Sequence, residues 1–437
     1  MEQRPTPVPA AKQVGDAPGP RTWAEPTVWT ERLLTALEQG VKGGVWFSLI
    51  DKVYLPGNLA SALTKVVAHR GAAGVDPVTV EKFLRHAEDN LDKVRAELRQ
   101  ETYRPQAIRR VWIPKPGSTE KRPLGIPTVR ERVVQTAVVH VLQPLFEQDF
   151  APTSFGCRPG RGAQQALARV EELLAAGYGY VVDAELKSYF DTIPHERLLQ
   201  RLGDKVTDGR VLRLIESFLK AGILEELREW TPTAGAPQGA VLSPLLSNVY
   251  LNPLDHLLAA HGFELVRSAD DFVILCRSQA DAARALDVVR AWVEANGLTL
   301  HPDKTRLVEA ATTTFDFLGY RFERDKRYVR PKSLEKLKAT VRAQTRRIDG
   351  RSLSCLVTDL NRTLRGWFGY FKNCHVTVFG TLDGWIRRRL RSLLRKRQGL
   401  KGMSRHGADE ERWPVSYFAA QGLFSLKTAH VRYVNPR

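Results

Sequence analysis

The sequence predicts an α+β protein, because apolar residues follow a helical period in some stretches and form short strand-like runs in others. Helical spacing prevails from Trp29 onward, as at Leu84, Leu91, Val94 and Leu98. The middle of the chain holds short apolar runs typical of strands, at residues 180–182, 263–266 and 272–275. Helical stretches lie between them, at 210–219 and 280–295. Strands that carry acids at their ends, with helices packed on one face, are typical of an α+β sheet domain.

The C-terminal quarter is predicted to be helical and strongly basic. Residues 332–437 contain 23 Lys and Arg against 7 Asp and Glu, and so hold most of the formal net charge of +18. A cationic block of this size usually binds a polyanion, although a solvated basic face is the alternative. In residues 385–398 we expect an apolar stripe around Leu390, with Arg388, Arg391 and Arg395 on another face. Charge alone does not distinguish RNA, DNA and anionic lipid.

Length and composition narrow the class of protein. A chain of 437 residues with 43% hydrophobic content predicts two to three folded domains rather than wholesale disorder. No apolar run approaches the roughly 18 residues that a membrane span requires, so we expect no membrane partner. The four cysteines lie far apart, which excludes a zinc knuckle and a disulfide scaffold and suits a reducing, bacterial-type cytoplasm. Residues 1–26 are rich in Pro, Ala and Gly and predict a flexible tail without the features of a signal peptide.

Acidic residues mark the ends of two predicted strands. Asp270 and Asp271 stand between two apolar runs, where we expect a two-residue acidic turn in a hairpin. Asp183 and Glu185 follow the apolar run at 180–182 and would share one strand face. Several carboxylates in one place suit Mg²⁺, and two such ions can activate a hydroxyl and stabilise a leaving pyrophosphate. Asp-Asp turns are also common as plain surface turns, and Asp183 could simply form a turn or cap a helix.

Read together, several motifs resemble those of the reverse transcriptase/maturase proteins encoded by group II introns. They occur in the order of that family, at residues 74–76, 113–127, 155–160, 236–244, 297–305 and 317–320. The resemblance implies a right-hand polymerase with helical fingers, a palm with an antiparallel sheet, and a basic all-α thumb known as domain X. The implied boundaries are a tail at 1–26, fingers at 27–150, palm with part of the fingers at 151–325, and thumb at 326–437.

The resemblance also implies a function and its residues. The expected reaction is RNA-directed DNA polymerisation, in which dNTPs are added to a primer 3′-hydroxyl. Two Mg²⁺ ions would be held by Glu185, Asp270 and Asp271, and Asp183 would assist these ligands. The expected dNTP contacts are Lys115, Lys121, Arg122, Tyr189, Phe190 and Gln238. The expected contacts to template, primer or intron RNA are Arg158, Gly239, Lys304, Gly319, Arg362, Arg365, Arg388, Arg391 and Arg395.

Several of these residues have a plainer interpretation in isolation. The cations at 115–122 could form a solvated basic loop, and Tyr189 and Phe190 more often belong to a core than to a nucleotide site. Trp367 and Phe371 alternate with Arg362 and Arg365, as in nucleic-acid-binding segments, but they could equally pack between helices.

Two departures from the family pattern leave the activity open. Glu185 stands where the family usually has Asp, and its extra methylene moves the carboxylate by roughly 1 Å, which can cost on the order of a hundredfold in rate. Ser268 stands where the family usually has Tyr. The alternative function is therefore a maturase that binds intron RNA, with weak or lost polymerisation. We expect no HNH endonuclease module, because no Cys/His cluster follows the thumb.

Overall fold

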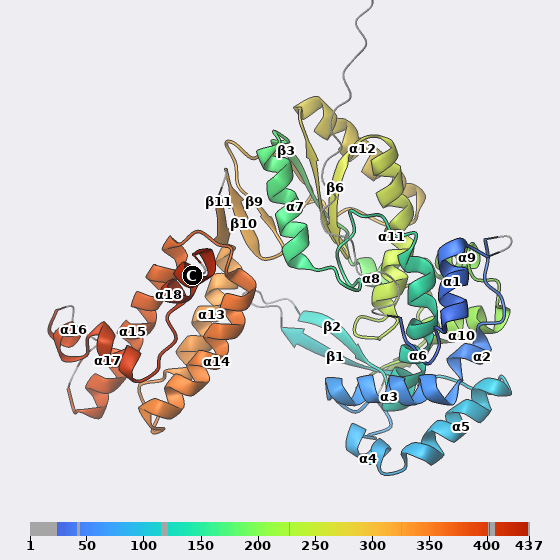
Figure 1. Cartoon of the computed structure of the whole chain (residues 1–437), viewed down its shortest axis with the longest axis horizontal. Coiled ribbons are helices and arrows are strands. Elements are labelled where there is room, and N and C mark those ends of the chain that lie inside the picture. Colours follow the sequence, from blue (N-terminus) through green and yellow to red (C-terminus); the bar gives the residue numbers. More distant parts are fainter. Residues whose placement is uncertain are drawn as a thin grey trace, which may run out of the picture.

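The computed structural model describes residues 24–41, 44–114, 121–226, 228–324, 326–400, 402 and 407–435. Within these residues, helices gather at both ends of the chain and three sheets lie between them (Figure 1). The two helical regions stand apart in this view, and the β1–β2 hairpin points across the space between them. The mixture of helices and sheets agrees with the predicted α+β class.

One buried helix organises the N-terminal region. The helix α6 (Val129–Glu147) has buried residues on all sides, so it must be enclosed by other elements. Its first turn is capped by Thr128, whose hydroxyl accepts from the backbone N–H of Glu131. The surrounding helices are α1 (Glu31–Gln39), α2 (Ile50–Val53), α3 (Pro56–His69), α4 (Val80–Leu84) and α5 (Ala87–Arg99).

A small four-stranded sheet follows, in the order β2-β1-β4-β5. The strands β1 (Ile108–Pro114) and β2 (Lys121–Ile126) form an antiparallel hairpin. The strand β4 (Ile223–Glu225) pairs in parallel with β1, and β5 (Arg228–Trp230) pairs antiparallel with β4. Segments about a hundred residues apart in the chain are thereby joined in one sheet.

The central sheet is antiparallel throughout, with the order β6-β7-β3-β8. Its strands are β3 (Tyr180–Glu185), β6 (Glu264–Ser268), β7 (Asp271–Cys276) and β8 (Arg306–Glu309). Val182 and Ile274 pack with α11 (Ser243–Ala260) and α12 (Gln279–Ala295), whereas Val181 and Val273 pack on the other face with α7 (Ala163–Ala175). The prediction of helices on one face is therefore wrong, because successive residues of β3 and β7 are apolar and both faces need cover.

The C-terminal region joins the central sheet through a three-stranded sheet. Its strands are β9 (Phe315–Phe317), β10 (Tyr320–Glu323) and β11 (Lys326–Val329), and the helices α13 (Pro331–Gln344), α14 (Leu353–Phe371) and α15 (Thr377–Arg397) follow. Three short helices come last among the described residues, α16 (Ala408–Arg412), α17 (Val415–Ala420) and α18 (Leu426–Val434). Trp367 and Phe371 pack together with ring centroids 4.8 Å apart, so these two aromatic residues belong to the core of the region.

The predicted elements of the middle region are confirmed, with slightly different ends. The stretch at 210–219 forms α10 (Gly209–Leu219), and the run at 180–182 is the first half of β3. The short helices α8 (Tyr189–Thr192) and α9 (His195–Gly203) lie between β3 and α10. In the part of the chain that the structure describes, no helix has the length and apolar character needed to cross a bilayer.

Candidate active site

The central sheet brings three of the predicted catalytic carboxylates together. Glu185 is the last residue of β3, and its Cα lies directly opposite that of Asp271, the first residue of β7. Asp271 also pairs with Ser268 across the β6–β7 hairpin, and Asp270 precedes it in the turn. Three carboxylates from two adjacent strands thus meet at one end of the sheet.

The turn differs by one residue from the predicted acidic turn. Because Ser268 pairs with Asp271, the two turn residues are Ala269 and Asp270, and Asp271 belongs to the strand. Ala269 has a φ of +60°, a value that alanine rarely adopts but that a tight hairpin turn requires. The two aspartates therefore stand on different backbone elements, one in the turn and one in the ladder.

Burial and the charges of neighbouring carboxylates raise the pKa values of Asp270 and Asp271. Burial, together with the charges of Asp183, Asp270 and Glu185, raises the pKa of Asp271 to about 7. Burial, with the charge of Glu185, also raises the pKa of Asp270, while Arg122 and Lys304 offset part of the rise. So much negative charge in a partly buried place favours a bound cation or proton.

Two cations on the neighbouring segment meet these acids. Lys304 Nζ lies 2.6 Å from Glu185 Oε1, and Arg306 Nε lies 3.1 Å from Asp183 Oδ2. Asp183 shares the strand face of Glu185, as predicted, but its carboxylate faces Arg306. Burial raises the pKa of Asp183 although Arg306 acts in the opposite direction.

The donor chemistry at this end of the sheet fits Mg²⁺, but the side chains are not arranged around an ion. Within the described ranges, no three His, Cys, Asp or Glu side chains form a group that could hold a metal. Instead, Glu185 is directed at Lys304. Carboxylates whose pKa values are raised by mutual repulsion gain from a hard cation. Glu185, Asp270 and Asp271 would hold the ion once Lys304 releases Glu185.

Two of the predicted nucleotide contacts line one pocket. Phe190 and Gln238 border a pocket of about 330 Å³ together with Arg110 and Trp230. Tyr189 does not reach it. Its side chain is 1% exposed, and its hydroxyl donates to the carbonyl of Ser247 at 2.9 Å. The prediction that Tyr189 contacts a nucleotide is wrong, because this ring fills the core while the next residue points into the pocket.

The predicted triphosphate cations come from the β1–β2 hairpin. Lys121 and Arg122 are exposed at the start of β2, and Lys115 lies outside the described residues. Gly239 has a φ of +99°, and a Cβ at this position would lie 2.6 Å from the carbonyl oxygen of Gly125. Gly239 therefore lets its own segment approach β2 closely, which fixes the hairpin against the segment that carries Gln238.

Comparison with known proteins gives the family. Residues 113–322 match the family described as reverse transcriptase (RNA-dependent DNA polymerase), and residues 334–413 match the maturase-specific domain of group II introns. Protein YkfC of Escherichia coli is 30% identical over 348 residues, which cover 69% of this chain and 86% of YkfC. The chain belongs to the group II intron reverse transcriptase/maturase family. The predicted resemblance is thereby confirmed.

Other relatives match shorter parts of this reverse transcriptase/maturase. The group II intron-encoded protein LtrA of Lactococcus lactis is 36% identical over 196 residues, and the match spans 44% of this chain but only 32% of LtrA. Among solved structures, a chain of a partial Cas6-RT-Cas1–Cas2 complex is 25% identical over 57% of this chain and 41% of its own length. Its TM-score is 0.36.

The predicted RNA contacts of the reverse transcriptase/maturase fall into two groups. Arg362, Arg365 and Arg388 are exposed, as binding to a phosphate requires. Arg391 and Arg395 are buried, so their prediction as RNA contacts is wrong. Arg391 Nε donates to the carbonyl of Trp413 at 3.0 Å, and Arg395 Nη1 lies 2.8 Å from Asp409 Oδ1. Both arginines tie α15 to the segment that follows it.

Arg158 is also a structural residue rather than a template contact. Its side chain is buried, and its Nη2 lies 2.6 Å from Glu147 Oε1. Nη1 donates to the carbonyls of Ala151 and Ser154 at 2.6 and 2.8 Å. Gly319 has a φ of +82° and lies against Ser333 at the start of α13, and its role in binding stays a prediction.

Arg306 is a residue of the site that the sequence analysis missed. It lies two positions after Lys304, and both cations meet acids of β3. The sequence offers a signal, because two cations in alternate positions before an apolar strand residue can face the same side of a sheet. Without the pairing of β3 with β8, nothing indicated that this side carries the acids.

Proposed function

We propose that this chain is an RNA-directed DNA polymerase that adds dNTPs to a primer 3′-hydroxyl on an RNA template. The observation that carries the proposal is the meeting of Glu185, Asp270 and Asp271 at one end of the sheet, with the pKa of Asp271 raised to about 7. A carboxylate cluster of this kind has little structural use, because it repels itself. It is the expected environment for hard divalent cations.

The surrounding residues would bind and orient the nucleotide. Lys121 and Arg122 supply cations for a triphosphate, and Phe190 and Gln238 border a pocket beside them. Mg²⁺ held by the three carboxylates would activate the primer hydroxyl and stabilise the leaving pyrophosphate. Membership in a reverse transcriptase family supports the same reaction.

Primer extension on an RNA template with dNTPs and Mg²⁺ tests the proposal. The wild type is expected to extend the primer, and Asp270→Ala to abolish extension. The matched control is Asp287→Ala, because Asp287 is an exposed aspartate on α12, away from the hairpin. If the wild type is inert while Glu185→Asp extends the primer, the native chain has lost polymerisation. If neither extends it, the enzymatic proposal fails.

A second candidate function is that of a maturase, in which the chain stabilises folded intron RNA. The observations that favour it are the match of residues 334–413 to a maturase-specific domain and the exposed Arg362 and Arg388 in this basic region. Splicing of a group II intron assisted equally by the wild type and by Asp270→Ala would show that RNA binding is independent of polymerisation. Loss of assistance in Asp270→Ala would contradict that independence.

A further inference from the structure

A fully buried arginine lies directly beneath the turn that carries Asp270. Arg267, near the end of β6, and Asp255, on α11, are both 0% exposed. Arg267 Nε donates to Asp255 Oδ1 at 2.7 Å, and Nη2 donates to Asp255 Oδ2 at 2.5 Å. Such a two-point contact fixes both the position and the plane of the guanidinium group.

The third guanidinium nitrogen of Arg267, Nη1, links two different parts of the molecule. Nη1 donates to the side-chain oxygen of Asn248 on α11 at 3.0 Å, and to the carbonyl of Ala269 in the turn, also at 3.0 Å. The rigid guanidinium group therefore connects the helix to the turn. Because Ala269 has a positive φ, a hydrogen bond to its carbonyl stabilises a conformation that alanine rarely adopts.

A second segment, which contains Gly156, also lies against the turn. Asn248 Nδ2 donates to the carbonyl of Gly156 at 2.9 Å, so the same asparagine holds a second segment. A Cβ at Gly156 would lie 2.4 Å from the backbone nitrogen of Ala269. The backbone of Gly156 and the guanidinium group of Arg267 thus both lie against Ala269, and Asn248 of α11 holds both.

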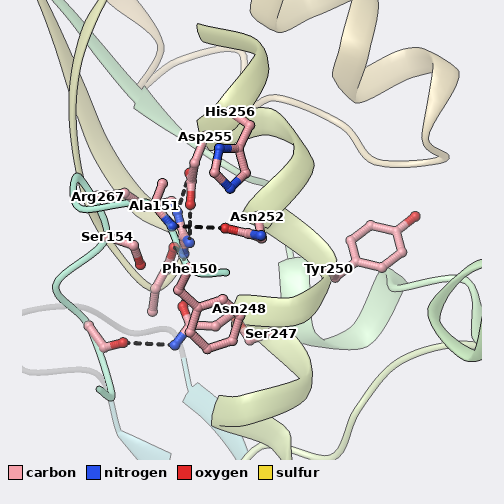
Figure 2. Close-up of polar contacts among 12 residues, drawn as sticks. Phe150, Ala151, Ser154, Ser247, Asn248, Tyr250, Asn252, Asp255, His256 and Arg267 are labelled. Carbon is pink, nitrogen blue, oxygen red and sulfur yellow. Dashed lines mark hydrogen bonds and ion pairs between the residues drawn. The ribbon is translucent and has the colours of Figure 1, made fainter. Parts of the chain in front are cut away.

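The strand that leads into the turn is fixed by the same segment. The backbone N–H of Arg267 donates to the carbonyl of Thr153 at 2.9 Å, and that of Phe155 donates to the carbonyl of Arg267 at 2.8 Å. One turn further along α11, the side chain of Asn252 accepts from the backbone N–H of Ala151 at 3.1 Å (Figure 2), and among the described residues it makes no hydrogen bond with Arg267. Among the described residues, Asn248 and Asn252 therefore differ in whether they reach the arginine.

We propose that Arg267, oriented by Asp255 and Asn248, is a positioning residue that fixes the Ala269 turn and so sets where Asp270 and Asp271 present their carboxylates. This inference rests on the proposed polymerase function. Arg267 touches no reacting atom and acts only through the backbone of the turn. A displacement of about 1 Å at a reacting group can lower a rate by on the order of a hundredfold. The effect of losing this arrangement should therefore fall on turnover and on the Mg²⁺ dependence rather than on the affinity for primer–template.

Primer extension by the full chain, with the Mg²⁺ concentration varied, tests the proposal. In Arg267→Lys and Asn248→Ala we expect kcat to fall by about tenfold or more and the Mg²⁺ concentration for half-maximal rate to rise. The affinity for primer–template should stay within about twofold of wild type. Lysine cannot reproduce the planar contact, and Asn248→Ala removes one of the two side chains that orient Arg267, together with the bond to Gly156, while the ion pair with Asp255 stays in place. The matched control is Asn252→Ala, which should keep the wild-type kcat and Mg²⁺ dependence.

Hydrogen exchange of residues 264–276 provides a readout that does not depend on activity. Faster exchange at the turn in Asn248→Ala, but not in Asn252→Ala, is expected. If Arg267→Lys does not fold, Asn248→Ala decides the question. If the wild type extends no primer, the polymerase proposal fails and hydrogen exchange alone tests the positioning. Wild-type kcat and exchange in Asn248→Ala, or equal losses in Asn248→Ala and Asn252→Ala, would overturn the inference.

Discussion

Lys304 donates to Glu185 at 2.6 Å, so an ammonium group covers the carboxylate that stands opposite Asp271. Both side chains are partly exposed, at 48% for Lys304 and 38% for Glu185. An ion pair of this exposure contributes modestly, roughly 0.2–1 kcal/mol. A metal ion that binds Glu185 must displace Lys304 and therefore competes with this pair.

Replacement of Lys304 should consequently ease metal binding. In Lys304→Met we expect Mg²⁺ to bind about twofold to fivefold more tightly, because the competing ion pair is lost. Isothermal titration of the full chain with Mg²⁺ measures this directly, independently of any role of Lys304 in holding nucleic acid. Lys220→Met is the control, since Lys220 also lies 2.6 Å from a glutamate, Glu216, on the distant helix α10. Unchanged or weaker Mg²⁺ binding in Lys304→Met would contradict the competition.

Gly156 is predicted to tolerate no side chain. In Gly156→Ala the new methyl group would lie 2.4 Å from the backbone of Ala269, so either the hairpin or the segment at 155–157 must shift. We expect a loss of about 1–3 kcal/mol in the free energy of unfolding and a slower extension reaction. Urea denaturation and primer extension measure the two effects. Gly179→Ala is the control, because a Cβ there meets nothing within 4 Å. Equal stability of the two variants would show that the hairpin shifts to accept the methyl group without loss of stability.

The sequence was sufficient for the class of fold and for the acidic residues, because both depend on local patterns. The strand ends at Glu185 and Asp271 follow from short continuous apolar runs that stop at acidic residues. The turn was misplaced by one residue, because nothing in the local pattern shows that Ala269 adopts a positive φ. Strand pairing decides this, and pairing is a property of the whole sheet.

Local sequence patterns could not predict which charged residues are buried. Arg388 and Arg395 lie on the same helix and have similar neighbours in the sequence. Arg395 is nevertheless buried against Asp409, whereas Arg388 is exposed. The difference arises from residues 407–414, which fold back onto one side of α15. In the same way, the spacing of Asn248, Asn252 and Asp255 indicates that α11 has a polar face. The spacing does not indicate that Arg267 is the residue that binds Asn248 and Asp255 there.

This difference predicts opposite effects for two arginines of α15. Arg388→Gln should leave the melting temperature unchanged and reduce the slope of log affinity for RNA against log salt concentration by about 1, if this side chain neutralises a phosphate. Arg395→Gln should keep the slope but destabilise the protein by roughly 3–5 kcal/mol, because it breaks a buried ion pair. Filter binding across salt concentrations and thermal denaturation separate the two. A reduced slope in a stable Arg395→Gln variant would contradict the structural role.

The buried histidine of α6 should make the stability of the N-terminal region depend on pH. His140 is 6% exposed, and its Nδ1 and Nε2 lie 2.8 and 2.7 Å from Asn58 Oδ1 and Lys65 Nζ. Burial, with the charge of Lys65, lowers the pKa of His140 to about 4, although Glu25 acts in the opposite direction. The neutral ring accepts from Lys65, and a proton on Nε2 would break that contact.

The sign of the pH dependence follows from this lowered pKa. The unfolded chain takes up the proton below about pH 6.5, whereas the folded chain resists it until about pH 4, so the contribution of His140 to the stability falls as the pH falls between these values. The full loss amounts to about 3 kcal/mol. Urea denaturation of wild type and His140→Gln at pH 7.5, 6 and 4.5 isolates this contribution, because the raised pKa of Asp271 acts in the opposite direction in both proteins and cancels in their difference. The control His256→Gln, at an exposed histidine of α11, should follow the wild type. A stability difference between wild type and His140→Gln that stays constant from pH 7.5 to 4.5 would mean that the folded protein protonates His140 as readily as the unfolded chain does.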